Sequence, residues 1–322
     1  MWEMKATRDS FGEALLELGR KNKKIVVLSD DLEDSTRAEY FKKEFPDRFF
    51  NLGIAEQDVV GVAVGLSQLE LIPFACGFAV FLTDRAYEII RIAVCYNNSN
   101  VKLVGSHAGL TVGPDGATAQ SLEDLAIMRV LPNMTVLSPC DAIETKKATL
   151  RMAEISGPVY MRTGRVPYPV ITKESDPFEI GKANILRDGK DAVIIACGLL
   201  VSEGLLAADA LVKEGIEVAV INMHTIKPID RETILNYASK TGAIVTAEEH
   251  QVNGGLGSAV SEVIVSHMPV PVEMVAVADV FGESGDPEGL LKKYHLKSTD
   301  IIQAVKRAIR RKEGLVNTKV KR

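Results

Sequence analysis

The sequence NLGIAEQ, residues 51–57, sets the organisation of this chain. It has the character of a strand end, followed by a turn at Gly53 and a helix that opens on Glu56. Strand, short turn and helix in this order are the repeating unit of α/β folds. Such folds place their binding sites at the carboxyl ends of their strands. Glu56 is therefore the first candidate functional residue, and we expect a pocket beside it.

Apolar strands and helices alternate on both sides of this stretch. The strands are expected at residues 25–28, 49–52, 72–74, 101–106, 135–138 and 159–162. The helices are expected at residues 8–20, 56–69, 83–94 and 141–154, with one more after residue 121. Their expected caps are Thr83, Ser121 with Asp124, and Asp141 with Glu144. This alternation predicts a doubly wound, mostly parallel sheet.

A second, smaller α/β unit follows a break in this pattern. Residues 166–188 hold three prolines and a charge cluster, which is typical of a connection between domains. Further strands are expected at residues 192–196, 218–222, 243–247 and 272–275. Further helices are expected at residues 203–214, 231–239, 256–266 and 300–310, capped by Ser202, Asp230 and Thr299. We therefore predict a first domain over residues 1–170, a linker over 171–188 and a second domain over 189–322.

Composition and charge restrict the class of protein. The 322 residues are 46% hydrophobic and 25% charged, as in globular proteins that bury large cores. The net charge of −5 argues against nucleic-acid binding, and the basic run from Lys306 to Arg322 is interpreted as a solvated helix end running into a frayed terminus. The four cysteines are dispersed in apolar runs, and no run reaches the ~18 apolar residues that span a membrane. We therefore expect a cytoplasmic protein with free thiols.

Short motifs by themselves do not assign a chemistry. The sequence has no GxGxxG directly after a strand, no P-loop, no HExxH pair and no GxSxG elbow. The polar run SDDLEDS, residues 29–35, follows the first predicted strand and fits an acidic loop as well as part of a site. On the residues alone, the chain is a two-domain α/β protein with a cluster of polar loops.

Several longer motifs together resemble the thiamine diphosphate enzymes of the transketolase family. NLGIAEQ, the pair Phe78-x2-Phe81 and the stretches at residues 106–124, 131–144 and 157–165 are similar to the pyrimidine-binding domain of that family. The stretches EEHQVNGGLGSAVSE, 248–262, and FGESGDPEGLLKKYHL, 281–296, are similar to its C-terminal domain. The resemblance implies two doubly wound α/β domains: a pyrimidine-binding domain with a mostly parallel sheet, then a smaller transketolase C-terminal-type domain.

The part of the family that binds diphosphate and metal has no counterpart in this sequence. In the family, the diphosphate and Mg²⁺ bind an amino-terminal domain that carries a GDG motif, and no GDG occurs here. The resemblance therefore implies the C-terminal subunit of a split transketolase, active only with an N-terminal partner subunit in an α2β2 heterotetramer. The implied cofactors are thiamine diphosphate and Mg²⁺, with the metal ligands on the partner. The implied context is the pentose phosphate pathway.

The resemblance also assigns roles around the cofactor. Glu56 matches the glutamate that hydrogen-bonds N1′ of the aminopyrimidine ring, where a carboxylate favours the imino tautomer that takes the proton from C2 of the thiazolium ring. Phe78 and Phe81 match the aromatic wall against the pyrimidine. Dipole complementarity at a helix start and simple core packing are the alternative interpretations of these three residues. The other implied cofactor contacts are Asp31, Leu32 and Ile54.

A second set of matches implies a sugar-phosphate site. Arginine, histidine and a serine hydroxyl suit a phosphate dianion, because charge-assisted hydrogen bonds to its oxygens are strong and directional. An aspartate matches the residue that reads a sugar hydroxyl near the reacting carbon. Surface salt bridges are the alternative interpretation of the arginines. The implied substrate residues are Arg8, Ser35, His107, Asp115 and Arg165.

Two departures from the family pattern leave the substrate open. Ala119 replaces a histidine that would contact substrate oxygen, so Gln120 or a partner residue is a candidate substitute. Asp84 stands where a third aromatic residue is expected. We predict transfer of a two-carbon ketol unit from a ketose phosphate to an aldose phosphate. The alternatives are the beta subunit of a 2-oxo-acid dehydrogenase, another thiamine diphosphate enzyme with a different substrate, and a non-catalytic scaffold subunit.

Overall fold

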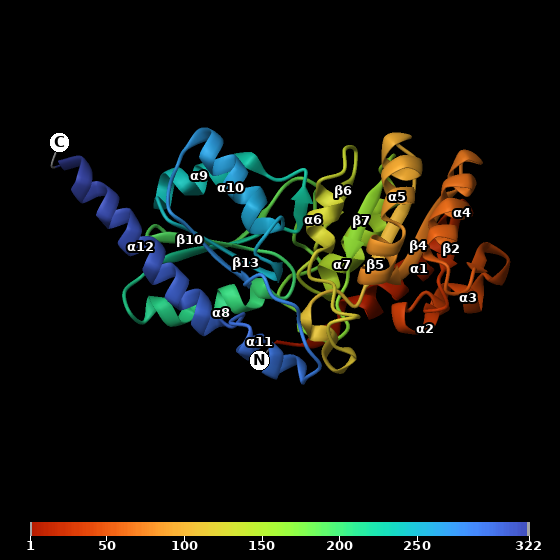
Figure 1. Ribbon diagram of the computed structural model, residues 1–322, viewed down its shortest axis with the longest axis horizontal. Helices are drawn as coiled ribbons and strands as arrows, with labels where there is room; N and C mark the ends of the chain where they lie inside the picture. Colours follow the sequence, from red (N-terminus) through yellow and green to blue (C-terminus); the bar gives the residue numbers. More distant parts are fainter. Residues whose placement is uncertain (1, 321–322) are drawn as a thin grey trace.

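Two α/β units lie side by side along the long axis of the molecule (Figure 1). The structure is a computed structural model that describes the backbone of residues 2–320 and the side chains of residues 2–314. The first unit, red to yellow-green in Figure 1, lies at the right, and the second, green to blue, at the left. Both sheets are mostly parallel, which confirms the predicted fold class.

The first sheet has seven strands in the order β12-β6-β7-β5-β4-β2-β3. Six strands of the first unit run parallel: β2 (Ile25–Ser29), β3 (Phe49–Asn51), β4 (Ile72–Phe78), β5 (Lys102–Ser106), β6 (Thr135–Leu137) and β7 (Val159–Arg162). The seventh, β12 (Thr225–Lys227), comes from the second unit and pairs antiparallel with β6. Alternate strand residues face opposite layers, so Val27 packs into one core cluster and Leu28 into another.

Helices cover both faces of this sheet. One layer contains α1 (Thr7–Lys21), α3 (Glu39–Glu44) and α7 (Ala142–Met152). The other contains α4 (Glu56–Gln68), α5 (Tyr87–Ile89), α6 (Asp124–Arg129) and two π-helical segments, η2 (Phe81–Arg85) and η3 (Ile90–Tyr96). The short elements α2 (Glu33–Thr36), η1 (Pro46–Arg48) and η4 (Leu110–Asp115) lie in connections. The single helix predicted at residues 83–94 is therefore split by π turns, which concentrate at functional sites.

The second sheet has five strands in the order β14-β13-β10-β11-β9. Its strands are β9 (Asn184–Arg187), β10 (Ala192–Ala196), β11 (Val218–Asn222), β13 (Ile244–Gln251) and β14 (Val272–Val277), and only the edge strand β9 is antiparallel. Its helices are α8 (Leu200–Val212), α9 (Arg231–Thr241), α10 (Leu256–His267), α11 (Pro287–Lys293) and α12 (Ser298–Val320). Strand β9 lies within residues 171–188, which the sequence predicts as a linker, and the domain boundaries remain a prediction.

Some predicted helix caps are wrong. Asp141 and Asp230 do accept a hydrogen bond from the backbone N–H three residues on, as predicted. Thr83 instead lies inside η2, where its hydroxyl donates to the carbonyl of Ala79 at 2.8 Å. Ser202 lies inside α8 and bonds the carbonyl of Leu199. The remaining corrections are that α6 begins after Glu123 rather than at a Ser121 cap, and that Thr299 already lies within α12.

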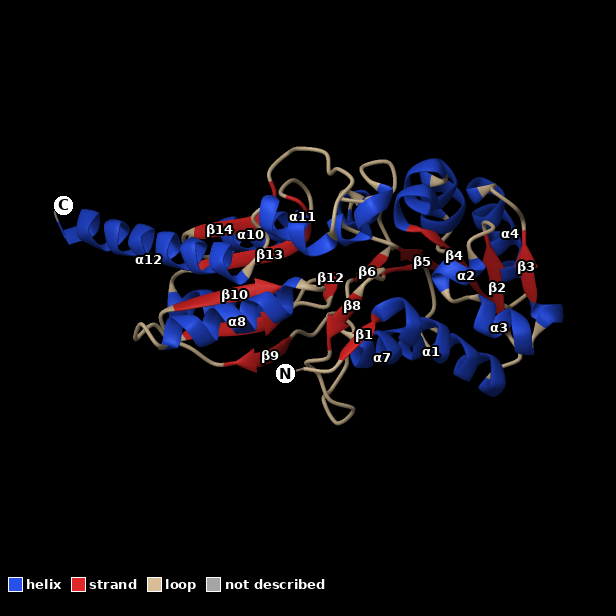
Figure 2. Ribbon diagram, turned by 90° about the horizontal axis from the view of Figure 1, so that it is seen from below, coloured by secondary structure: helices blue, strands red, loops and turns tan. Residues whose placement is uncertain are grey.

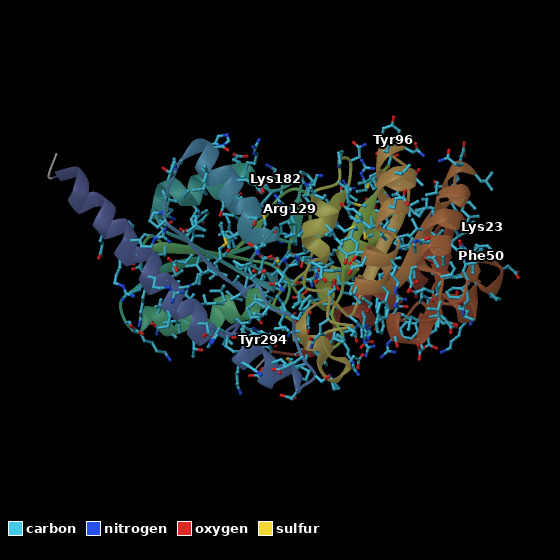
Figure 3. The ribbon with its side chains drawn as sticks, in the orientation of Figure 1. Lys23, Phe50, Tyr96, Arg129, Lys182 and Tyr294 are labelled. Atoms are coloured by element: carbon cyan, nitrogen blue, oxygen red, sulfur yellow. The ribbon has the colours of Figure 1, made fainter. Side chains whose placement is uncertain are left out.

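The two units are joined by polar contacts and by strand β12, which the second unit adds to the first sheet. The backbone N–H of Thr111 donates to Glu249 Oε1 at 2.6 Å, and Arg162 Nη1 donates to the carbonyl of Glu249 at 3.1 Å. Arg129, labelled in Figure 3, pairs with Glu262 of α10 at 2.7 Å. Figure 2 shows β12 beside β6 at this junction, together with the two-stranded ribbon of β1 (Met4–Ala6) and β8 (Pro167–Pro169).

The long helix α12 runs outward from the second unit (Figure 1). Of the basic run at residues 306–322, residues 306–320 belong to this helix, and residues 321–322 lie outside the described part of the chain. Within the described residues, no helix has the length and apolar character needed to cross a membrane.

Candidate active site

Glu56 is the first residue of α4, and only 5% of it is exposed. The preceding turn uses a left-handed backbone at Gly53, whose φ is 74°. The helix start supplies unpaired N–H groups and a positive dipole end, which favour a carboxylate. Glu56 Oε1 also accepts a 2.6 Å hydrogen bond from Nη1 of Arg85, whose side chain is half exposed. The predicted position of Glu56 at a helix start is therefore confirmed, and its cationic partner is new.

A column of flat groups stands beside this carboxylate. Phe78, at the end of β4, and Phe81, at the start of η2, have ring centroids 5.8 Å apart and an interplanar angle of 14°. His107 stacks on Phe78 with centroids 3.9 Å apart. The guanidinium carbon of Arg85 lies 4.3 Å from the centre of the Phe81 ring. The structure thus brings Glu56, Phe78 and Phe81 together and joins them to His107 through the stack.

A positively charged edge adjoins His107. Arg8 Nη1, from α1, lies 3.5 Å from His107 Nε2 and donates to the carbonyl of Ser35 at 2.9 Å. Burial first, and then the charges of Arg8, Arg165 and Arg37, together lower the pKa of His107 to about 3. A neutral imidazole beside these arginines keeps a hydrogen-bonding site without adding a charge. The predicted substrate residues Arg8, Ser35 and His107 therefore lie together.

Arg165 and Asp115 form a second part of this edge. Arg165 Nη1 donates to Asp115 Oδ1 at 3.1 Å, and about a third of each side chain is exposed. Gly164, the residue before Arg165, donates its backbone N–H to Thr7 Oγ1 at 2.8 Å, which holds this segment beside the start of α1 and Arg8. Because an exposed ion pair is weak, a ligand anion can compete for the arginine at small cost.

The remaining predicted cofactor residues lie on neighbouring loops after β2 and β3. Asp31 has a left-handed backbone, with φ of 71°, and accepts a hydrogen bond from Asn51 Nδ2 at 3.0 Å. Leu32 is partly buried, whereas Ile54 is 77% exposed. The structure therefore places Asp31 and Leu32 at the same sheet edge as Glu56 and leaves Ile54 open to solvent.

Ala119 and Asp84, the two positions that depart from the family pattern, both lie in the described structure near this site. Ala119 is buried, and the amide Nε2 of Gln120 donates to the carbonyls of Leu110, Gly113 and Glu283. Gln120 is thus engaged in holding the loop, which disfavours it as the substitute for the missing histidine. Asp84 lies in η2, and burial raises the pKa of its carboxyl to about 6.

Sequence reasoning missed two residues of this region, Arg85 and Asp30. Asp30 follows β2 and is 2% exposed, and among the described residues neither carboxylate oxygen has a hydrogen-bond partner. Burial and then the charge of Glu56 raise the pKa of Asp30 to about 7. The only signal was its place in the polar run SDDLEDS. Within the described part of the chain, no group of three or more His, Cys, Asp and Glu side chains is arranged to hold a metal ion.

Comparison with known proteins identifies the class. The family described as "Transketolase, pyrimidine binding domain" matches residues 3–170, and "Transketolase, C-terminal domain" matches residues 181–301. The chain belongs to the transketolase family, as the resemblance predicted. Its two units correspond to the pyrimidine-binding and C-terminal domains of that family.

Three similar proteins are each named or described as a section or subunit of a transketolase, or as a split transketolase. A protein named putative transketolase C-terminal section, from Methanocaldococcus jannaschii, is 46% identical and covers 94% of this chain and 95% of its own length. The 6-deoxy-6-sulfo-D-fructose transketolase subunit SqwH of Clostridium sp. is 41% identical and covers 95% of both chains. A solved structure described as "Split gene transketolase, inactive beta4 tetramer" is 51% identical with a TM-score of 0.90, over 95% of this chain and 99% of that one.

Proposed function

We propose that this chain is the C-terminal subunit of a split transketolase. It transfers a two-carbon ketol unit from a ketose phosphate to an aldose phosphate, with thiamine diphosphate as cofactor. The observation that carries the proposal is the buried carboxylate of Glu56 at a helix start beside the Phe78–Phe81 stack. The relatives named as transketolase subunits over nearly their whole length support the same activity.

The residues of this site fit the pyrimidine end of the cofactor. The guanidinium of Arg85 already meets both Glu56 and Phe81, so a flat group with N–H donors satisfies this position. Glu56 would hold a proton at a ring nitrogen, and Phe78 and Phe81 would orient the ring, with Asp31, Leu32 and Ile54 nearby. When bound, thiamine diphosphate supplies an ionisable carbon nucleophile that also accepts electrons from the substrate.

The diphosphate and Mg²⁺ belong to a partner subunit in this proposal. The chain has no GDG motif, and a solved relative is described as an inactive tetramer of one kind of subunit. Neighbouring helical elements α4 and η3 also carry exposed apolar side chains: Val62 at 40%, Ile92 at 45% and Tyr96 at 84%, the last labelled in Figure 3. Such a surface suits a subunit interface, so we propose an α2β2 heterotetramer.

The substrate class is proposed from the charged edge. Arg8 and Arg165 offer positive charge and hydrogen bonds to a terminal anion such as a phosphate, and the neutral His107 beside Arg8 offers a hydrogen bond. The Clostridium relative is named for a sulfonated sugar, and a sulfonate is likewise a terminal anion. A 2-oxo-acid dehydrogenase beta subunit remains the second candidate, because Ala119 removes one contact to substrate oxygen. The cytoplasm is the proposed compartment, since all four cysteines are buried free thiols.

Ketol transfer by the chain and its N-terminal partner tests this function. We expect activity only from the two chains together, and a loss of several orders of magnitude with Glu56→Ala, because the proton relay is lost. Asp58→Ala is the matched control, since Asp58 lies in the same first turn but is exposed. Unchanged turnover with Glu56→Ala would sink the mechanism.

Further measurements separate the alternatives. Release of CO2 from pyruvate by the same complex would favour the 2-oxo-acid alternative. Calorimetric titration of thiamine diphosphate and Mg²⁺ into the complex separates an enzyme from a scaffold, because a scaffold would take up no cofactor in a Glu56-dependent way.

A further inference from the structure

Arg85 occupies the position at which the proposed function places the aminopyrimidine ring. Its Nη1 donates to Glu56 Oε1 at 2.6 Å, and its guanidinium carbon lies 4.3 Å from the centroid of Phe81. The same flat cation thus pairs with the carboxylate of Glu56 and lies over the aromatic ring of Phe81. These are the two contacts that the cofactor ring would need.

A guanidinium is a close chemical match for an aminopyrimidine. Both are planar, both present N–H donors in the plane to a carboxylate, and both stack on an aromatic ring. A lysine ammonium would reproduce the charge but not the flat face. The structure therefore contains an internal group with the shape and donor pattern of the expected ligand.

The local fold aims Arg85 at this position. Arg85 is the last residue of the π-helical segment η2, whose first residue is Phe81. Gln57, the neighbour of Glu56 on α4, donates through Nε2 to the carbonyl of Arg85 at 3.0 Å. The backbone of Arg85 is therefore anchored to α4, whereas half of its side chain is exposed. A side chain on a fixed backbone with an open outer side can leave without unfolding its helix.

The ion pair between Arg85 and Glu56 also balances the charge of the buried carboxylate when no ligand is bound. Glu56 is buried, and a buried carboxylate without a partner is costly. Asp30, which feels the charges of both Glu56 and Arg85, is a second buried acid in the same region. A cation is therefore needed among these acids until another donor arrives.

We propose that Arg85 is an internal stand-in for the aminopyrimidine ring, which holds Glu56 and Phe81 in the unloaded subunit and moves out when the cofactor binds. This inference rests on the proposed function, because it takes the Glu56–Phe81 position as the pyrimidine site. Arg85 is thus a positioning residue whose displacement lowers the apparent affinity for cofactor.

Cofactor binding to the two-chain complex tests the proposal. Thiamine diphosphate with Mg²⁺ is titrated by calorimetry into complexes with the unsubstituted chain, Arg85→Ala, Arg85→Lys and the control Arg91→Ala, an exposed arginine of η3. We expect about tenfold tighter binding and faster uptake with Arg85→Ala, since no ion pair has to be broken. Arg85→Lys should lie between, and Arg91→Ala should match the unsubstituted complex.

A second readout does not depend on the cofactor. In thermal unfolding of the complex without cofactor, Arg85→Ala should lower the midpoint, and adding Glu56→Gln should restore it, because the unpaired charge is then gone. If Arg85→Ala fails to assemble, Arg85→Lys with the same titration carries the test.

The possible outcomes distinguish a failure of the stand-in role of Arg85 from a failure of the proposed function. Glu56-dependent uptake that is weaker or unchanged with Arg85→Ala would overturn the stand-in role alone, and would mean that Arg85 stays on Glu56 in the loaded site. Absence of any Glu56-dependent uptake by the unsubstituted complex would overturn the proposed function and this inference with it.

Discussion

Replacing Asp30 by alanine should stabilise the protein at pH 8 far more than at pH 5. Asp30 is 2% exposed, and within the described residues its carboxylate oxygens have no hydrogen-bond partner. Burial and the charge of Glu56 raise its pKa from 3.8 to about 7. A folded-state pKa above the unfolded value means that the native state binds more protons between these two values. Stability is therefore lost as the pH rises from about 4 to about 7.

The size of the effect follows from this displacement of the pKa. At about 1.36 kcal/mol per pKa unit, the ionised carboxylate costs about 4 kcal/mol above pH 7 and about 1–2 kcal/mol at pH 5. Removing the side chain leaves a small cavity, which costs about 1 kcal/mol. The net gain for Asp30→Ala is then about 3 kcal/mol at pH 8 and below about 1 kcal/mol at pH 5.

Denaturation by urea, followed by circular dichroism at the two pH values, measures this difference. The exposed acid Asp47 supplies the control variant Asp47→Ala, whose stability change should be small at both pH values. Equal destabilisation by Asp30→Ala at pH 5 and pH 8 would refute the reasoning, since it would mean that the carboxylate is favourably bound in the folded protein.

Three further predictions concern the packing of Gly77 against Asp30, the proposed phosphate contact of Arg8 and the buried acid Glu249. A Cβ added at Gly77 would lie 2.2 Å from Asp30 Oδ2, so Gly77→Ala should cost about 1–3 kcal/mol in urea denaturation, and combining it with Asp30→Ala should return most of that loss. Arg8→Ala should raise KM for a phosphorylated donor by about 10- to 100-fold in steady-state assays of the complex, with little effect on an acceptor that lacks phosphate. Burial raises the pKa of Glu249 to about 7, so Glu249→Gln should reduce the loss of unfolding free energy between pH 5 and pH 8.

The parts of the fold that could be predicted are those fixed by local pattern. The apolar run at Ile25 gives a strand because a strand buried on both faces is apolar along most of its length. Asp141 and Asp230 give helix starts because their side chains can accept from the backbone three residues on. The position of Glu56 follows from the same reasoning together with the motif around it.

The parts that could not be predicted depend on contacts between distant segments. The π turns of η2 aim Arg85 at Glu56, a residue 29 positions earlier, and no local spacing indicates that register. Thr83 resembles a cap in sequence but bonds the carbonyl of Ala79 inside this segment. The burial of Asp30 depends on the absence of a side chain at Gly77, on the neighbouring strand. Strand β12 pairs with β6, a strand about ninety residues earlier in the chain.

The strand β12 has a consequence for any attempt to excise the first domain. A fragment ending near residue 170 would lack Thr225–Lys227, which cover the edge of β6. The freed backbone N–H and C=O groups of β6 would then be open to pairing with another copy, a familiar route to aggregation. A separately expressed first domain should therefore aggregate, unless residues 225–227 are fused to it so that they still cover the edge of β6.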